Sequence, residues 1–394
     1  MRNTLADFAI GLVLLLSACS DQETTTAIPY QAVKEVFGTK IDPSNLPNYA
    51  SQSIPNYIRK DNTGANPITN EKAILGRVLF YDKSLSIDNT VSCASCHQQA
   101  FGFSDPTLAS QGVQGGQTTR HSMRLINTRF AVESKFFWDE RAATLEAQVT
   151  TPIQDHAEMG FSGQNGRPNL AALLTKLSGI AYYQELFTLA YGSSAVTEPR
   201  LQQALAAFIR SIQSFDSKYD LGRAQVNNDG APFPNFTAQE NLGKQLFLTP
   251  PVFDGTGTRI NGGAGCQGCH QAPEFDIDPN SRNNGIIRPL TQGAGLELAI
   301  TRSPTLRDAV NATGGSNGAF MHSGVLTSLQ NVVGHYNNIP AQPGNNNLDA
   351  RLNPGGNLQK LNLTGAEINA IVAFIQTLSG KDVYTNEKWG SPFN

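Results

Sequence analysis

The sequence predicts a mainly α-helical protein that consists of two tandem, similar domains with long loops. The first observation is an internal repeat, because Leu-Gly-Arg-Val-Leu-Phe at 75–80 returns as Leu-Gly-Lys-Gln-Leu-Phe at 242–247. The second is helical periodicity near the end of each half, whereas strand-like alternation is scarce. The third is composition, since 36 glycines and 21 prolines among 394 residues indicate long loops.

Each half closes with an expected amphipathic helix. Apolar residues recur there every three or four positions, which places them on one helix face. Thr364 and Glu367 form a capping box that predicts where the second helix begins. The two apolar stripes consist of Leu201, Leu205, Phe208, Ile209 and Ile212 in the first helix and of Ile368, Ile371, Val372 and Ile375 in the second.

The N-terminus has the pattern of an export signal. Arg2 precedes an apolar run over 8–16, which is too short to cross a bilayer, since a helix needs about 20 residues to do so. The run ends in Leu-Ser-Ala-Cys, which resembles the bacterial lipoprotein cleavage box, so we expect Cys19 to be lipidated. An ordinary signal peptide is the alternative. Ser20 favours the outer membrane, so the expected location is the periplasm, with a lipid anchor in that membrane.

The sequence suggests four segments. We expect a signal peptide over 1–19, a flexible polar tether over 20–60, an N-terminal domain over 61–225 and a C-terminal domain over 226–394. The boundary is placed at the Asn/Gly/Pro-rich stretch 226–236. The net charge of −3 gives no general attraction to nucleic acids.

Four of the five cysteines form two Cys-x-x-Cys pairs, each followed directly by a histidine. Two thiols at this spacing reach the two vinyl groups of one porphyrin, and the adjacent histidine then binds the iron. The alternatives are a redox dithiol, a zinc site shared by both pairs, and disulfides. Neither pair lies in a visible βαβ pattern, and the histidines would be superfluous in a shared zinc site. The sequence therefore predicts two covalent haem c groups, held by Cys93, Cys96, His97, Cys266, Cys269 and His270.

The residues after the first motif resemble those of a known superfamily. Phe-Trp-Asp-Glu-Arg-Ala at 137–142 is similar to the Phe-Trp-Asp-Gly-Arg-Ala segment of the bacterial di-haem cytochrome c peroxidase and MauG superfamily. Gln148, Pro152 and Glu158 follow at the superfamily's spacing, and the resemblance runs from about residue 70 to 380. It implies two cytochrome c-like domains whose N-terminal haem reacts with peroxide.

The resemblance implies roles for three residues. Glu158 would be the carboxylate that moves a proton between the peroxide oxygens, with Gln148 beside it. Trp138 would lie between the haems and help electrons to cross. Cleavage of an O–O bond needs a proton acceptor and a proton donor, which one carboxylate can provide in turn. The alternatives are a solvated carboxylate at a helix end and an ordinary core tryptophan.

The departures from the superfamily concern its histidines and its calcium. Members that need reductive activation carry a second histidine after the first motif, but the corresponding segment 111–117 has none. The first haem is therefore expected to be five-coordinate and open to peroxide, as in MauG-like members. His121 and His156 are the other histidines that could approach it. His121 stands where relatives have an asparagine that helps to bind an interdomain calcium ion, which puts that calcium in doubt.

Opposite His270 the second haem is expected to have a protein ligand. Tyr336 aligns with the axial methionine of peroxidases and with the axial tyrosine of MauG-type proteins. Met321 and His335 are the alternatives. An anionic phenolate favours the ferric state and lowers the reduction potential, whereas a thioether raises it.

Two functions from different classes remain. The leading hypothesis is a peroxide-reducing di-haem enzyme that takes electrons from a small c-type cytochrome, a cupredoxin or a protein side chain. The alternative is a non-catalytic di-haem electron-transfer cytochrome at the membrane surface, with two protein ligands on each iron. A haem-based sensor lacks a visible effector domain. Family members are often dimers, so by analogy a homodimer is expected.

Overall fold

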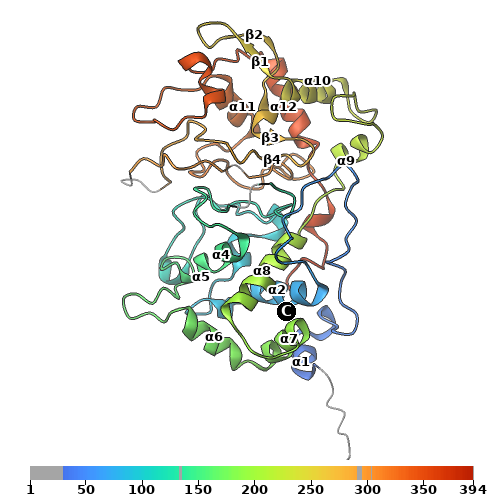
Figure 1. Ribbon diagram of the computed structural model, residues 1–394, viewed down its shortest axis with the longest axis vertical. Coiled ribbons are helices and arrows are strands. Elements are labelled where there is room, and N and C mark those ends of the chain that lie inside the picture. Colours follow the sequence, from blue (N-terminus) through green and yellow to red (C-terminus); the bar gives the residue numbers. More distant parts are fainter. Residues whose placement is uncertain (1–29, 133–134, 291–294, 303, 394) are drawn as a thin grey trace, which may run out of the picture.

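The computed structural model describes residues 30–132, 135–290, 295–302 and 304–393. Two lobes follow one another along the long axis of the molecule, one from each half of the chain (Figure 1). The export signal and Cys19 lie outside the described residues. In the part of the chain that is described, each helix is too short or too polar to cross a membrane.

Helices dominate both lobes. The N-terminal lobe contains α1 (Gln31–Phe37), α2 (Asn70–Tyr81), α3 (Cys93–Cys96), α4 (Leu145–Val149), α5 (Thr151–Gln154), α6 (Leu170–Ser178), α7 (Ala181–Tyr191) and α8 (Glu198–Ser211). The C-terminal lobe contains α9 (Lys218–Arg223), α10 (Ala238–Leu248), α11 (Leu329–Asn337) and α12 (Gly365–Gln376). Two antiparallel strand pairs complete it, β1 (Pro251–Phe253) with β2 (Arg259–Gly262) and β3 (His270–Gln271) with β4 (Asp276–Ile277). The prediction of a mainly helical fold is confirmed.

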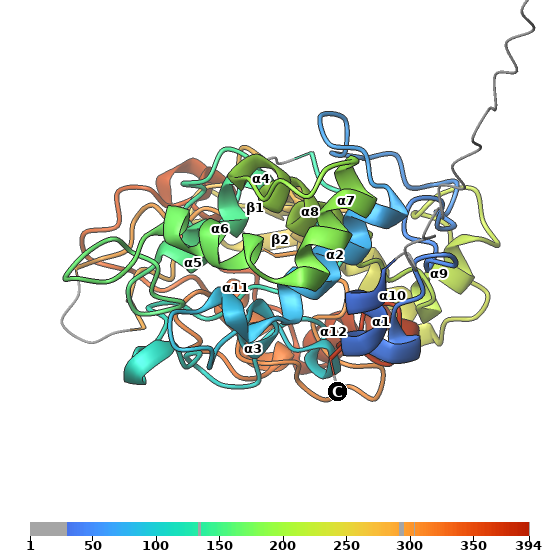
Figure 2. The ribbon, with the colours of Figure 1, turned by 90° about the horizontal axis from the view of Figure 1, so that it is seen from below.

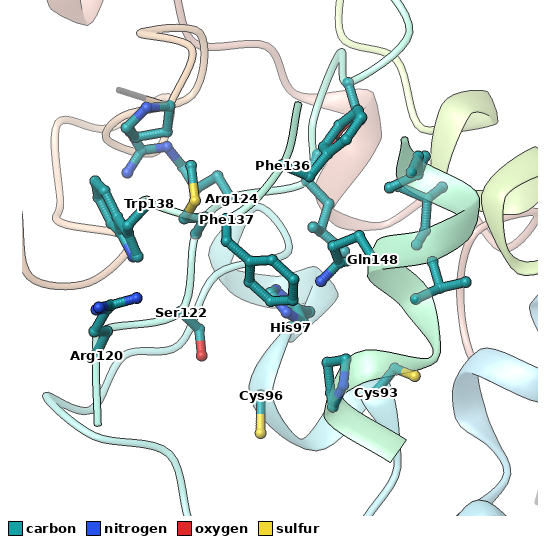
Figure 3. Close-up of a pocket in the computed structure, with 18 of the residues that line it drawn as sticks. Cys93, Cys96, His97, Arg120, Ser122, Arg124, Phe136, Phe137, Trp138 and Gln148 are labelled. Carbon is teal, nitrogen blue, oxygen red and sulfur yellow. The ribbon is translucent and has the colours of Figure 1, made fainter. Parts of the chain in front are cut away.

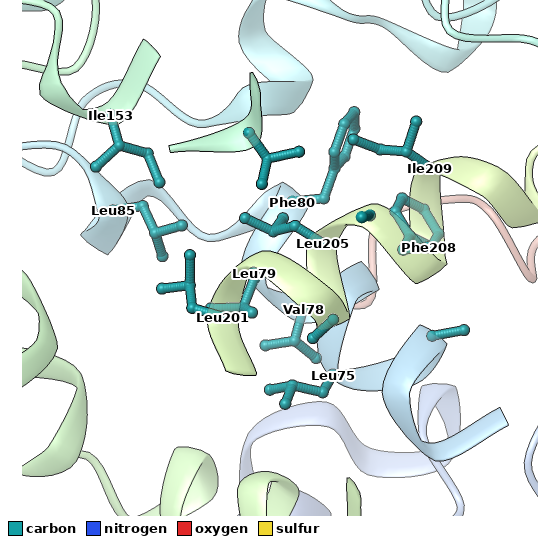
Figure 4. Packing of buried hydrophobic residues seen from close by; sticks show 14 of the residues in the cluster. Leu75, Val78, Leu79, Phe80, Leu85, Ile153, Leu201, Leu205, Phe208 and Ile209 are labelled. Carbon is teal, nitrogen blue, oxygen red and sulfur yellow. The ribbon is translucent and has the colours of Figure 1, made fainter. Parts of the chain in front are cut away.

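The core of the N-terminal lobe forms where α2 packs against α8 (Figures 2 and 4). Thr69 caps α2 by accepting a hydrogen bond from the backbone N–H of Lys72, which fixes where the helix begins. Gly76 lies at the crossing, where a Cβ atom would lie 2.0 Å from the carbonyl oxygen of Ala204. Only glycine therefore allows the two helices to approach this closely.

The core of the C-terminal lobe repeats this crossing with α10 and α12. Both helices begin with a capping box, Thr237 with Glu240 and Thr364 with Glu367, as the sequence predicted for the second. Gly243 is the counterpart of Gly76, and a Cβ atom there would lie 1.8 Å from the carbonyl oxygen of Ala370. The repeated Leu-Gly pair thus marks the closest helix–helix contact of each lobe.

The segment over 30–60 packs against the protein rather than forming a tether. Val33 and Phe37 of α1 are buried, and the ring of Phe37 lies 5.3 Å from that of Tyr182 on α7. Further along, Tyr49 is also fully buried. The predicted flexible tether over 20–60 is therefore wrong from residue 30 onward, because irregularly spaced apolar residues anchor a segment that has little periodicity.

The C-terminal tail crosses back to the N-terminal lobe, and the chain ends beside α2 and α7 (Figure 1). Trp389 is only 1% exposed, and its Nε1 donates to the carbonyl oxygen of Ser211 at 3.1 Å. Arg77 and Tyr81 of α2 donate to the carbonyl oxygens of Gly390 and Trp389, both at 2.7 Å. The last residues of the predicted domain 226–394 thus belong to the other core.

The change from one core to the other occurs earlier than predicted. Ile212 belongs to the N-terminal core and Tyr219 to the C-terminal core, so the boundary precedes the stretch 226–236. At the junction of the two cores, fully buried Arg307 donates to Asp220 at 3.0 Å, and Tyr57 donates to the same carboxylate at 2.8 Å. A buried ion pair, with a further hydrogen bond from Tyr57, therefore joins three distant segments at the junction.

Candidate active site

The first Cys-x-x-Cys-His motif lines a cavity of about 200 Å³ in the N-terminal lobe. Ser92 and Ser95 form a capping box, so α3 begins at the first cysteine. Cys93, Cys96 and His97 share one wall of the cavity (Figure 3). One short helical turn therefore presents both thiols and the imidazole to the same space.

His97 has the protonation state that binding to iron requires. Burial lowers its pKa, so the ring is neutral at pH 7. Its Nδ1 lies 3.2 Å from the carbonyl oxygen of Phe103, which favours a proton on that nitrogen and leaves Nε2 able to bind a metal.

The other wall of this cavity gathers the three residues to which the sequence assigned catalytic roles. Gln148 comes from α4, Trp138 from the loop before α4, and Glu158 from the loop after α5. Figure 3 shows the ring of Phe137 and the amide of Gln148 beside His97, with Trp138 farther to the side. The structure thus brings together residues that are far apart along the chain.

Glu158 is a half-buried titratable group on this wall. Burial, and then the charge of Asp155, raises the pKa of its carboxyl group to about 7. Arg141 acts in the opposite direction, because its positive charge favours the carboxylate. A pKa near neutral suits a group that must both accept and return a proton.

The loop over 111–117 packs against the backbone at Glu158. The backbone N–H of Val113 donates to the carbonyl oxygen of Glu158 at 2.9 Å. A Cβ atom at Gly112 or Gly116 would lie 1.8 Å or 2.2 Å from the carbonyl oxygen of Ala157. The segment without a histidine is therefore a glycine-rich support that fixes the backbone beneath the carboxylate.

Trp138 lies at the contact between the lobes and is 8% exposed. Its indole N–H donates to the carbonyl oxygen of His121 at 2.8 Å. Its own carbonyl oxygen accepts hydrogen bonds from the backbone N–H groups of Thr301 and Arg302, both at 3.1 Å. Contacts from both lobes thus fix the indole in place.

An ion-pair network crosses the same contact. Arg120 donates to Asp139 at 2.8 Å and, across the lobes, to Glu297 at 2.7 Å, and the ring of His322 lies 3.0 Å from the other oxygen of Glu297. These acidic groups already have basic partners, and among the described residues no three His, Cys, Asp or Glu side chains gather as metal ligands.

The remaining histidines of the N-terminal lobe have other partners. His121 lines the first cavity, and its Nδ1 lies 3.3 Å from the carbonyl oxygen of Leu108. The Nδ1 of His156 lies 2.9 Å from the hydroxyl of Ser162.

The second motif lines a separate cavity of about 730 Å³ in the C-terminal lobe. Cys266, Cys269 and His270 share it with Tyr336 of α11. Burial, and then the charge of Arg124, lowers the pKa of His270 to about 4, so this imidazole is also neutral. Both histidines therefore have the form that binds a metal.

The three candidate ligands of the second haem meet around Asn284. Tyr336 lines the cavity, and its hydroxyl lies 3.1 Å from Asn284 Nδ2. The sulfur of Met321 lies 3.2 Å from the same nitrogen. His335 points to the backbone instead, with its Nε2 2.8 Å from the carbonyl oxygen of Asn284. The geometry favours Tyr336, since its side chain faces the cavity and that of His335 has another partner.

The four motif cysteines fit haem attachment better than the alternatives. All four are free thiols, and burial raises the pKa of Cys93 and of Cys266 to about 12, whereas a redox dithiol depends on a lowered pKa. The two pairs line different cavities, which excludes a shared zinc ion. Each cavity thus offers two thiols and a neutral imidazole, the donor set of a covalently bound haem c.

Two helical lobes, each with a Cys-x-x-Cys-His motif beside a cavity, define a c-type cytochrome with two haem sites. A family model described as "Di-haem cytochrome c peroxidase" matches residues 70–227. The methylamine utilization protein MauG of Methylophilus methylotrophus is 29% identical over 325 residues, which are 80% of this chain and 84% of that protein. The cytochrome-c peroxidase IdrP1 of Pseudomonas sp. (strain SCT) is 27% identical over 350 residues, 80% of this chain and 82% of that protein. The chain is thus similar, over about four fifths of its length, to enzymes of the di-haem cytochrome c peroxidase and MauG family.

Solved structures support the fold. A MauG-like protein associated with microbial copper homeostasis superposes with a TM-score of 0.64 at 25% identity, over 87% of this chain and 99% of that one. The diheme peroxidase BthA of Burkholderia thailandensis E264 gives 0.60 at 20% identity, over 89% of this chain and 92% of that one. The expected pair of cytochrome c-like domains is confirmed. The family carries two haem c groups, and both motifs agree with this.

Sequence reasoning missed three contributors to these sites. Gly112 and Gly116 could have been noticed in the sequence, because they lie in the segment 111–117 that follows the first motif. Only the packed structure shows that they lie against the backbone of Ala157. Asn284 had no such signal, since its partners Met321, His335 and Tyr336 all lie much further along the chain.

Proposed function

We propose that the protein reduces hydrogen peroxide at the N-terminal haem with electrons that pass through the C-terminal haem. One peroxide takes up two electrons and two protons and yields two waters. The haem iron supplies the peroxide-binding position and the redox chemistry, with His97 and His270 as the protein ligands. Similarity to di-haem cytochrome c peroxidases and MauG proteins supports this assignment.

Glu158 is the residue that moves the proton in this proposal. Its carboxylate accepts a proton from one peroxide oxygen and returns it to the oxygen that leaves, so that no net proton is consumed by the side chain. Gln148, on the same wall, orients the peroxide by hydrogen bonding. The observation that carries the proposal is a half-buried carboxyl group with a pKa of about 7 in the cavity that His97 lines.

The N-terminal site should act without prior reduction. Support comes from the segment 111–117, which lacks a histidine and packs against the backbone at Glu158. The test mixes fully oxidised holoprotein with peroxide and follows peroxide loss from the first turnover. Immediate turnover is expected. A protein that is inert until one haem has been reduced would contradict this part of the proposal.

Electrons should reach the N-terminal site by way of Trp138. Its position at the contact between the lobes, with backbone contacts on both sides, supports such a role. The donor is a small c-type cytochrome, a cupredoxin or an oxidisable side chain of a protein substrate. Turnover assays with each donor class distinguish these three, since only the correct one gives saturable kinetics.

A non-catalytic electron-transfer cytochrome is the rival function. It requires two protein ligands at both irons, whereas Glu158 and Gln148 line the N-terminal site opposite the motif. The EPR spectrum of the resting protein separates the two functions. A high-spin ferric signal supports the enzyme, and two purely low-spin centres would support the electron carrier.

We also propose that Cys19 carries a lipid that holds the protein in the periplasm, at the outer membrane. The support is the Leu-Ser-Ala-Cys sequence at 16–19. Metabolic labelling with a fatty acid should mark the wild type and not Cys19→Ser. A label that persists in the variant would contradict the assignment.

A further inference from the structure

Asn284 occupies a special position in the C-terminal cavity. Its Nδ2 lies 3.1 Å from the hydroxyl of Tyr336 and 3.2 Å from the sulfur of Met321. An amide NH₂ group has two hydrogens, so one nitrogen can donate to both partners at once. One residue therefore contacts two of the three candidate ligands of the second haem.

The orientation of this amide is determined by its surroundings. The side-chain oxygen of Asn284 accepts a hydrogen bond from the backbone N–H of Ile286 at 3.1 Å. Because the oxygen faces a donor, the nitrogen must face Tyr336 and Met321. The backbone is held as well, since the ring of His335 contacts the carbonyl oxygen of Asn284 at 2.8 Å. Two consecutive residues of α11 thus contact Asn284, His335 at its main chain and Tyr336 at its side chain.

Met321 shows a second, independent sign of constraint. Its backbone has a φ of +68°, in the left-handed region that an unbranched non-glycine residue rarely adopts. Such a conformation costs on the order of 1 kcal/mol and persists only where the surroundings enforce it. Here it accompanies a sulfur that lies against the amide of Asn284.

We propose that Asn284 is a positioning residue that selects Tyr336 over Met321 as the ligand of the C-terminal haem iron. This inference rests on the proposed assignment of Tyr336 and deepens it. One N–H of Asn284 donates to the Tyr336 oxygen and stabilises its negative charge once the proton has left. The other N–H engages the thioether of Met321 and keeps it from the iron. The selection thus comes from a neutral amide that can only donate toward both candidates.

Two variants separate these effects. Asn284→Asp replaces the donor with a carboxylate that only accepts, so Tyr336 keeps its proton and Met321 becomes the ligand. The phenolate-to-iron charge-transfer band should then disappear. Asn284→Leu removes both hydrogen bonds without adding a charge, so the preference for Tyr336 is lost and Met321 competes for the iron. Because a thioether raises the reduction potential, the ferric-to-ferrous ratio of this haem at a fixed solution potential should fall about tenfold, which corresponds to about 59 mV for one electron.

The controls use the same holoprotein. Asn357→Leu changes a surface amide that donates to the carbonyl oxygen of Gly255, and it should leave band and potential unchanged. Asn284→Asp alone should show the spectrum of a methionine-ligated haem. The double variant Asn284→Asp with Met321→Leu should lose this spectrum. If both Asn284 variants keep the wild-type spectrum and potential, the proposed selection is wrong. If Tyr336→Phe leaves the band unchanged, the ligand assignment fails, whereas peroxide turnover at the other haem reports separately on the proposed function.

Discussion

The two haem cavities share a scaffold and differ in the wall opposite the motif. Gly76 and Gly243 let a helix pair cross closely in each lobe, and each crossing stands behind a Cys-x-x-Cys-His turn. In the N-terminal lobe the opposite wall carries Gln148 and Glu158. In the C-terminal lobe Tyr336 occupies the corresponding cavity wall. The two lobes therefore share a scaffold and present different side chains to their cavities.

Burial acts on both walls but with different results. It raises the pKa of Glu158 to about 7, which leaves that carboxyl group able to exchange protons under ordinary conditions. It raises the pKa of Tyr336 well above its usual range, so the phenol stays protonated unless a metal ion binds it. These two directions agree with the proposed roles, proton transfer for Glu158 and ligation for Tyr336.

Replacing Glu158 should have the largest effect. Glu158→Gln keeps the shape of the side chain and removes the proton acceptor, so peroxide turnover should fall by about 10²- to 10⁴-fold. Steady-state kinetics with saturating donor measures the loss, and Glu387→Gln on the exposed surface is the matched control. A loss smaller than tenfold would place the proton transfer elsewhere.

Adding a side chain at the helix crossings should destabilise either lobe. Gly76→Ala and Gly243→Ala each place a Cβ atom against a backbone carbonyl that cannot move aside, and each should lower the free energy of unfolding by about 1–3 kcal/mol. Denaturant titration measures the change. Gly365→Ala, where a Cβ atom would contact nothing within 4 Å, should be nearly neutral. If the two variants lose different amounts of unfolding free energy, the packing at the two crossings is less alike than the backbone geometry indicates.

The pH dependence should distinguish the N-terminal site from the C-terminal one. Turnover needs the ionised form of Glu158, so kcat/KM should fall about tenfold per pH unit below pH 7 and level off above it. The stability contribution has the opposite sign, since a raised pKa favours the folded state at low pH, and this advantage is lost as the pH rises through about 7. Neither trend should appear in Glu158→Gln. A wild-type profile that is flat between pH 5 and 8 would argue against this carboxyl group.

The ion pairs between the lobes should have the smallest effect. Arg120 and Glu297 are about one-fifth exposed, so Arg120→Met should cost about 1 kcal/mol of stability, and less at high salt. A double-mutant cycle with Glu297→Gln isolates the coupling between the two residues. If the coupling is zero, other contacts hold the lobes together.

The predictable part of the candidate site was the part with fixed spacing. Cys93, Cys96 and His97 follow one another along one turn, so the sequence alone could place them in one cavity. Glu158 could be singled out by resemblance, but its raised pKa could not, because burial depends on segments from elsewhere in the chain. Asn284 and Tyr336 are separated by a long loop region, and no local pattern connects them.

Local rules in the sequence determined the helices, their caps and the two attachment motifs, because spacing along the chain sets these features directly. Only the tertiary structure decided where the ends of the chain belong, since Val33 and Trp389 are buried in a core to which no periodicity points. It also decided what surrounds each cavity. Packing between distant segments determines which side chains are removed from water, and this sets the proton affinity of Glu158. It also determines which side chains come into contact, and this sets the orientation of Asn284.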